Sequence, residues 1–102
     1  MKTKYHIEIT QQALSDQFTE EALGDVIQGN IRQDRINNQF GHDYIHFDGS
    51  AFTAGFNYLK QQELDIIDHL RQDHFTAARH AFGRVTHSWQ DFYSHSNYVR
   101  LW

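Results

Sequence analysis

The sequence predicts an all-α protein, a bundle of about four helices, and three observations support this. Apolar residues recur three and four positions apart along most of the 102-residue chain, which is the period of an amphipathic helix. The chain contains no proline, which suits long uninterrupted helices. No convincing strand is found in the sequence. At this length one domain is expected, so we take residues 1–102 as a single helical domain and leave open whether it is a fragment of a larger one.

The first two helices are expected in the amino-terminal third of the chain. Apolar residues from Ile7 onward predict a first helix that ends at residues 16–18. Thr19 can cap the second helix, because its hydroxyl can accept a hydrogen bond from a free backbone N–H of the first turn. The apolar stripe of this helix continues into Asn30 and Asp34, at positions that should face the core. A buried carboxylate must be paired or metal-bound, because burying it alone is costly. The alternative is a helix that leaves the core at Asn30.

Two further helices are expected in the second half of the chain. Residues 37–49 are rich in Asn, Asp and Gly and predict a structured loop. Ser50 can cap a third helix, whose apolar stripe extends to Leu70. Asp73 can cap a fourth helix, whose apolar stripe extends to Phe92.

The strongest chemical signal is the triplet His87, Asp91 and His95 in the fourth helix. Residues four apart are neighbours on a helix surface, so the three side chains share one face and fan over only about 80°. Imidazole and carboxylate groups at this spacing are typical of metal coordination. The chain has no cysteine, so a metal here must take nitrogen and oxygen ligands. The alternative is a solvated polar face with scattered histidines. Gly83, one turn earlier, predicts a close approach to the helix backbone.

The loop and the helices hold further candidates. His46 lies between two apolar residues that would anchor it, so it is favoured as a ligand over His42. The doublet of His42 and Asp43 resembles the metal-binding pair of HD phosphohydrolases, but those proteins place it on a helix. Ligating histidines usually donate their second ring N–H to a carboxylate or carbonyl. We expect such a partner among Asn30, Asp48, Gln90 and Ser94. Gln90 is the least favoured of these, because it sits about 100° from Asp91 around the helix.

Composition and charge argue against some function classes. The net charge is −4 and no basic run is present, which argues against nucleic-acid binding. No stretch is apolar enough to span a membrane. The first residues do not resemble a signal peptide, because no apolar segment follows them. The localisation therefore stays open.

Taken in order, these segments resemble the Het-C-like family, which is related to zinc-dependent phospholipase C and to fungal zinc-dependent single-strand nucleases. The resemblance spans the chain and is most specific in residues 87–99. Segments around His6, Asp34 and His46 support it by their order. The segment of residues 90–99 is also similar to the amino-terminal region of some von Willebrand A-domain proteins.

The resemblance implies a fold of the phospholipase C type with a three-zinc cluster in a cleft. The metal ligands that it implies are His6, Asp34, His46, His87, Asp91 and His95. Asp91 would bridge two zinc ions, and Asp34 or Asp48 would orient the attacking water. Two metals can clamp both oxygens of a phosphodiester in hydrolysis. The expected function is therefore a metal-dependent phosphodiester hydrolase, and the alternative is a non-catalytic Het-C-like metal-stabilised interaction module.

One departure from the family pattern shapes the remaining expectations. The phospholipases complete their third zinc site with a later His-x-x-x-Glu pair, and no residue after His95 can supply it. The last family helix would therefore be missing, and a C-terminal edge with Tyr98, Leu101 and Trp102 would be open to self-association. We expect one to three Zn²⁺ ions, with other divalent metals left open, and a phosphodiester or phospholipid substrate.

Overall fold

The computed structural model describes residues 2–34 and 52–95, with the side chains of the last two residues left aside. Within these residues, all regular structure is helical, and the all-α expectation is confirmed. The elements are α1 (Thr3–Leu14), α2 (Glu20–Ile31), the 3-10 turn η1 (Arg32–Asp34), α5 (Phe52–Arg71) and α6 (Phe75–His95). Among these described helices, none combines the length and the apolar character that crossing a membrane requires.

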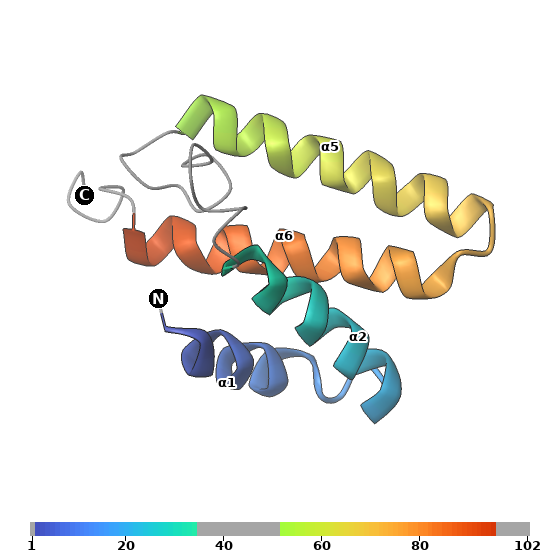
Figure 1. The fold of residues 1–102 in the computed structure, drawn as a ribbon, viewed down its shortest axis with the longest axis horizontal. Helices are drawn as coiled ribbons and strands as arrows, with labels where there is room; N and C mark the ends of the chain where they lie inside the picture. Colours follow the sequence, from blue (N-terminus) through green and yellow to red (C-terminus); the bar gives the residue numbers. More distant parts are fainter. Residues whose placement is uncertain (1, 35–51, 96–102) are drawn as a thin grey trace.

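The long helices α5 and α6 form an antiparallel hairpin (Figure 1). Leu59 of α5 packs against Val85 and Phe92 of α6 in a buried cluster. Phe52 and Ile66 of α5 cover its edges. Each large apolar side chain that is fully buried stabilises the fold by about 1.5–3 kcal/mol, so this cluster holds the hairpin together.

Helix α2 crosses α6 at very short range, and two glycines make this possible. A Cβ atom added at Gly29 would lie 2.1 Å from the backbone oxygen of His80. One added at Gly83 would lie 2.0 Å from the backbone oxygen of Val26. The two backbones therefore touch where any side chain would separate them. This confirms the close approach expected at Gly83, and it brings the end of α2 beside the middle of α6.

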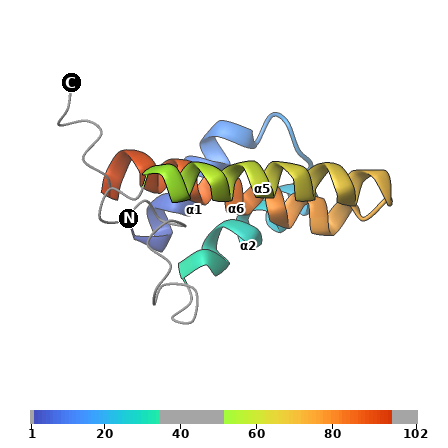
Figure 2. The same ribbon diagram turned by 90° about the horizontal axis from the view of Figure 1, so that it is seen from above.

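Helix α1 packs against α2 and against α6 (Figure 2). Its buried residues are polar, His6 and Thr10, while its apolar Ile9 is 41% exposed. The helix ends at Leu14, just before the expected end at residues 16–18. An apolar core therefore does little to hold α1 in place.

Of the expected N-caps in the first three helices, one lies in the described part. The hydroxyl of Thr19 accepts a hydrogen bond from the backbone N–H of Ala22 at 3.2 Å, so the cap of α2 is confirmed. Ser50 and the expected loop at residues 37–49 lie outside the described residues.

The expected cap at Asp73 is wrong, because this residue closes α5 and does not start α6. Its φ angle of 60° lies in the left-handed region. Its N–H donates to the carbonyl of Leu70 at 3.2 Å, and the N–H of His74 donates to the carbonyl of His69 at 2.8 Å. This pair of bonds is a Schellman motif, which satisfies free carbonyls at a helix C-terminus. Because the turn between α5 and α6 is short, its polar residue Asp73 caps the end of α5.

Candidate metal centre

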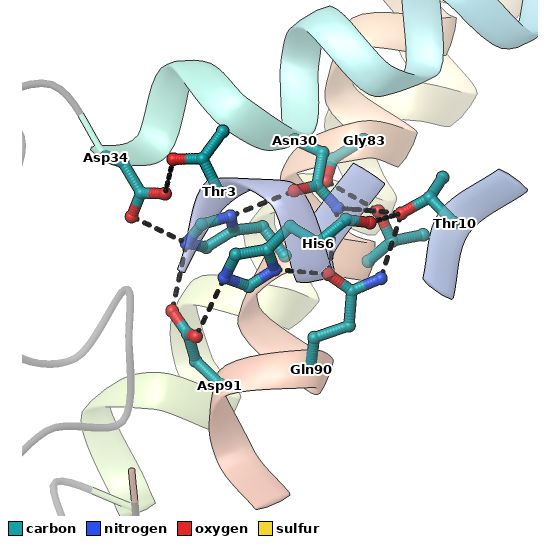
Figure 3. A network of polar contacts seen from close by, with 10 residues as sticks. Thr3, His6, Thr10, Asn30, Asp34, Gly83, Gln90 and Asp91 are labelled. Carbon is teal, nitrogen blue, oxygen red and sulfur yellow. Dashed lines mark hydrogen bonds and ion pairs between the residues drawn. The ribbon is translucent and has the colours of Figure 1, made fainter. Parts of the chain in front are cut away.

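Ionisable side chains from three separate elements meet at one point (Figure 3). His6 comes from α1, Asp34 from η1, and His87 with Asp91 from α6. The Nε2 atom of His87 lies 2.9 Å from Asp91 Oδ2 and 3.4 Å from Asp34 Oδ1. The Nε2 atom of His6 lies 3.1 Å from Asp91 Oδ1. His6, Asp34 and His87 each offer a ligand atom within 4.8 Å of the other two.

The cluster is buried on the α6 side and reaches solvent at η1. The side chains of His6, His87 and Asp91 are at most 1% exposed, whereas that of Asp34 is 24% exposed. The Nε2 atom of His6 makes no hydrogen bond with any described residue, although Asp91 is within reach. Since the distance is short enough, the direction of the contact is what fails. A buried imidazole nitrogen without a hydrogen bond is a candidate metal ligand.

The two imidazole rings are stacked face to face. The centroids of His6 and His87 are 3.9 Å apart, and their planes differ by 16°. Their Nε2 atoms approach the same carboxylate from one side, each at a different oxygen of Asp91. The carboxylate therefore lies across the ends of both rings.

The charges of this cluster shift two pKa values in opposite directions. Burial works to lower the pKa of His87, but hydrogen bonds and negative charge from Asp34 and Asp91 outweigh burial and raise it above its usual value. Burial works to raise the pKa of Asp34, but the hydrogen bond and positive charge of His87 outweigh it and lower the pKa. Both shifts favour a charged imidazolium between carboxylates when no metal competes for the site.

Two amide side chains hold the far sides of the rings. Asn30 Oδ1 lies 3.0 Å from His87 Nδ1, and Gln90 Oε1 is in close contact with His6 Nδ1. The expectation of a polar partner for a candidate ligand is confirmed. Ranking Gln90 last was wrong, because α1 lies on that side of α6 and presents His6 to it. Asn30 is 1% exposed, so the alternative in which α2 leaves the core there is also wrong.

Sequence reasoning missed two threonines that take part in this network. Thr10 Oγ1 accepts hydrogen bonds from the amides of Gln90 and Asn30, and Thr86 Oγ1 accepts one from Asn30. The position of Thr10 in the sequence was the available signal. Thr10 lies one turn after His6 on the same face of α1, and a polar residue buried there must form hydrogen bonds.

The structure brings together part of the expected ligand set. His87 and Asp91 lie side by side on α6 and are buried, so the alternative of a solvated polar face is wrong. His46 and Asp48 lie outside the described residues, as do the side chains of Ser94 and His95. The expected apolar edge at the C-terminus also lies outside them.

Comparison with known proteins now adds to this picture. The model of the VWA7 N-terminal domain family matches residues 2–101. The von Willebrand factor A domain-containing protein 7 of Rattus norvegicus is 35% identical over 80 residues, and those of Mus musculus and Homo sapiens show the same identity over the same length. Each alignment covers 78% of this chain and 9% of the relative, so the chain spans a small part of these proteins. No solved structure matches.

These matches overturn the assignment to the Het-C-like family. The phosphodiester hydrolase of phospholipase C type and the Het-C-like interaction module fall with it, as does zinc as a family property. The physical reason is that the spacing of His87, Asp91 and His95 describes a metal-binding helix face, which unrelated families can share. The water-orienting roles expected for Asp34 and Asp48 depended on that resemblance. The similarity to von Willebrand A-domain proteins agrees with the matches.

Proposed function

This chain belongs to the VWA7 N-terminal domain family, and from that premise and the geometry of the cluster we propose that it binds a divalent metal ion. The ligands are His6, Asp34, His87 and Asp91. The observation that carries the proposal is the buried Nε2 atom of His6, which makes no hydrogen bond with a described residue while a carboxylate oxygen lies 3.1 Å away.

The spacing of the ligand atoms supports this proposal. Metal–nitrogen and metal–oxygen bonds of about 2.0–2.2 Å place neighbouring ligands of a tetrahedral site about 3.3–3.6 Å apart. The three nitrogen–oxygen separations in the cluster are 2.9, 3.1 and 3.4 Å. Oppositely charged side chains attract one another, so without an ion between them they lie slightly closer together than ligands around a metal. The ligands therefore need little movement to accept an ion.

The donor atoms favour transition-metal ions over calcium and magnesium. Imidazole nitrogen suits zinc, copper, iron and nickel, whereas Ca²⁺ and Mg²⁺ prefer sites built from oxygen alone. Two of the four ligands are imidazoles, so Zn²⁺ is the first probe to use and Ca²⁺ is a discriminating negative one.

Asp91 determines how many ions the cluster can take. Its two oxygens face different imidazoles, Oδ1 toward His6 and Oδ2 toward His87. A carboxylate placed in this way can either share one ion between both rings or bridge two ions about 3.5–4 Å apart. We therefore expect one to two ions per chain.

The experiment is metal titration of the chain after chelation and dialysis. Isothermal calorimetry with Zn²⁺ should give saturable binding of one to two ions, and elemental analysis of the loaded protein should agree. His87→Ala and Asp91→Ala should each abolish tight binding, because they remove central ligands. His74→Ala is the matched control, since this exposed histidine lies at the other end of α6. It should bind as the wild type does.

Equal binding by the wild type and both ligand variants would show that the histidines elsewhere on the chain collect the ion. Absence of binding by a folded wild-type chain would mean that the cluster is a network of ion pairs between protonated imidazole and carboxylate groups. Either result ends the proposal.

A further inference from the structure

The hydrogen bonds behind the imidazole of His6 run in one direction, and from this we infer that Thr10 is a positioning residue that sets the tautomer of this ring. In this arrangement Nδ1 of His6 carries the proton, and Nε2, which makes no hydrogen bond with a described residue, keeps its lone pair. His87 differs, because its Nε2 faces the carboxylates of Asp91 and Asp34, which favour a proton on that atom when no metal is bound. The use of the His6 lone pair rests on the proposed metal-binding function, whereas the tautomer itself can be measured without metal.

The first step is the direction of the two hydroxyl groups. Thr10 Oγ1 donates to the backbone carbonyl of His6 at 2.7 Å, and Thr86 Oγ1 donates to that of Gly83 at 2.8 Å. A carbonyl oxygen can only accept, and a hydroxyl has one hydrogen. Each threonine therefore donates its one hydroxyl hydrogen within its own helix. Its oxygen can only accept a hydrogen bond from any other partner.

The second step is the orientation of the two amides. The side-chain nitrogen of Gln90 lies 2.9 Å from Thr10 Oγ1, and that of Asn30 lies 2.9 Å from Thr86 Oγ1. Because these hydroxyls can only accept, the groups facing them must be NH₂ groups. Amide oxygen and nitrogen are assigned from such networks, and here the assignment follows from two backbone carbonyls. The contact of Asn30 Nδ2 with Gln90 Oε1 at 3.2 Å requires that the two amides be oriented together, as they are here.

The third step carries the direction to the rings (Figure 3). With the NH₂ groups turned toward the threonines, Asn30 Oδ1 faces His87 Nδ1 at 3.0 Å, and Gln90 Oε1 faces His6 Nδ1. These oxygens only accept, so each Nδ1 must donate. A neutral imidazole has one N–H, and its other nitrogen is then an acceptor or a metal ligand.

The consequence is that helix packing selects a tautomer that free histidine does not prefer. In water the neutral imidazole of histidine favours the proton on Nε2, which would block that atom as a ligand. In this protein, backbone carbonyls of α1 and α6 set the direction of the hydrogen bonds, and the amide of Asn30 in α2 takes part in the same network. Thr10 accepts hydrogen bonds from both amides, so losing its hydroxyl frees the amide of Gln90 to turn over.

The test is nitrogen-15 NMR of the histidine rings in the full chain without metal, at a pH where the imidazoles are neutral. The wild type should show Nδ1–H and a bare Nε2 for His6. Thr10→Val keeps the shape of the side chain and removes the acceptor, so His6 should gain the Nε2–H form. Zn²⁺ affinity should fall about 10-fold or more, as for other residues that orient a ligating histidine. Thr10→Ser should restore both readouts.

Thr76→Val is the matched control, because Thr76 is exposed near the start of α6 and far from the rings. It should leave the tautomers and the affinity unchanged. Circular dichroism checks that each variant folds, and Thr10→Ala, read at His6, is the second variant if Thr10→Val does not fold.

The outcomes separate this inference from the proposed function. Nε2–H on His6 of the wild type overturns the inference, and so does a folded Thr10→Val chain with an unchanged His6 tautomer. An Nδ1–H tautomer of His6 that responds to the variants in a chain that binds no Zn²⁺ supports the inference and refutes metal binding.

Discussion

At the scale of single residues, His87 links the two carboxylates of the cluster to the amide of Asn30. Its Nε2 atom faces Asp34 and Asp91, and its Nδ1 atom is held by Asn30. In the metal-free chain the two carboxylates favour the protonated ring, so a metal ion and a proton compete for the same nitrogen. The stability of the domain should therefore depend on pH in opposite ways with and without metal.

We expect the metal-free chain to be most stable between about pH 4 and pH 6.5. The pKa of His87 is raised above 6.5, so its contribution is fully present below pH 6.5 and is lost as pH rises through the raised pKa. The pKa of Asp34 is lowered below 3.8, so its contribution is present above pH 3.8 and is lost as pH falls through the lowered pKa. With Zn²⁺ bound, the stabilisation by metal should instead grow as pH rises through the histidine range.

Urea unfolding at a series of pH values, with Zn²⁺ or with chelator, measures both profiles. His87→Gln should flatten the fall of the metal-free profile above pH 6.5 and remove the effect of Zn²⁺. Two parallel profiles in the wild type would contradict competition between proton and metal.

At the scale of elements, the crossing of α2 and α6 places the amide of Asn30 behind His87. Gly29 and Gly83 allow this crossing, because each backbone occupies the space that a Cβ atom would need on the other. The geometry of the cluster therefore depends on residues that carry no functional group.

We expect Gly83→Ala to destabilise the chain and Gly24→Ala to stabilise it. Both glycines are inside helices, where alanine is intrinsically better by about 1 kcal/mol. A Cβ at Gly24 meets nothing within 4 Å, so that gain should be realised. At Gly83 the Cβ would lie 2.0 Å from the carbonyl oxygen of Val26, so the helices must separate. Overpacking of this kind costs about 1–3 kcal/mol or more.

Thermal and urea unfolding of the two variants measure the difference, with Zn²⁺ titration as the second readout. Gly83→Ala should also weaken metal binding, because separation of the helices moves Asn30 away from His87. Equal stability of the two variants would mean that the crossing is loose.

At the scale of the whole molecule, α1 is the element most dependent on polar contacts. Its buried residues are His6 and Thr10, whereas the α5–α6 hairpin is held by an apolar cluster. His6 is the proposed ligand of α1, and its Nε2 atom lies 3.1 Å from Asp91 of α6. A bound metal would therefore act as a cross-link between α1 and the rest of the bundle.

We expect metal to protect the backbone amides of α1 from hydrogen exchange much more than those of α5. At a free metal concentration of 100 times Kd, binding stabilises the native state by about 2.7 kcal/mol. Local opening of α1 breaks the site and so should be suppressed by a similar free energy, about 100-fold in exchange rate. Exchange measured by mass spectrometry with Zn²⁺ or chelator gives this comparison. His6→Ala is the control, in which metal should no longer protect α1. Equal protection of both helices would contradict the cross-link.

Much of the local structure follows from the sequence, because it depends on residues within one turn of each other. The helix period, the cap at Thr19 and the shared face of His87 and Asp91 are of this kind. The polar Asn30 in an apolar stripe also predicted a buried polar contact. The resemblance of residues 87–99 to the Het-C-like family was a weaker guide. Candidate metal ligands spaced one turn apart on a helix do not distinguish one family from another.

Only the tertiary structure decided which faces meet. Gln90 looked remote from the ligands because it lies on another side of α6, yet α1 covers that side and presents His6. Asp73 looked like a start signal, yet the short hairpin uses it to end α5. A helix offers several faces, and its sequence pattern states which residues share a face without stating which partner covers it. The order and direction of the hydrogen bonds from Thr10 to the rings therefore exist only once three helices have packed.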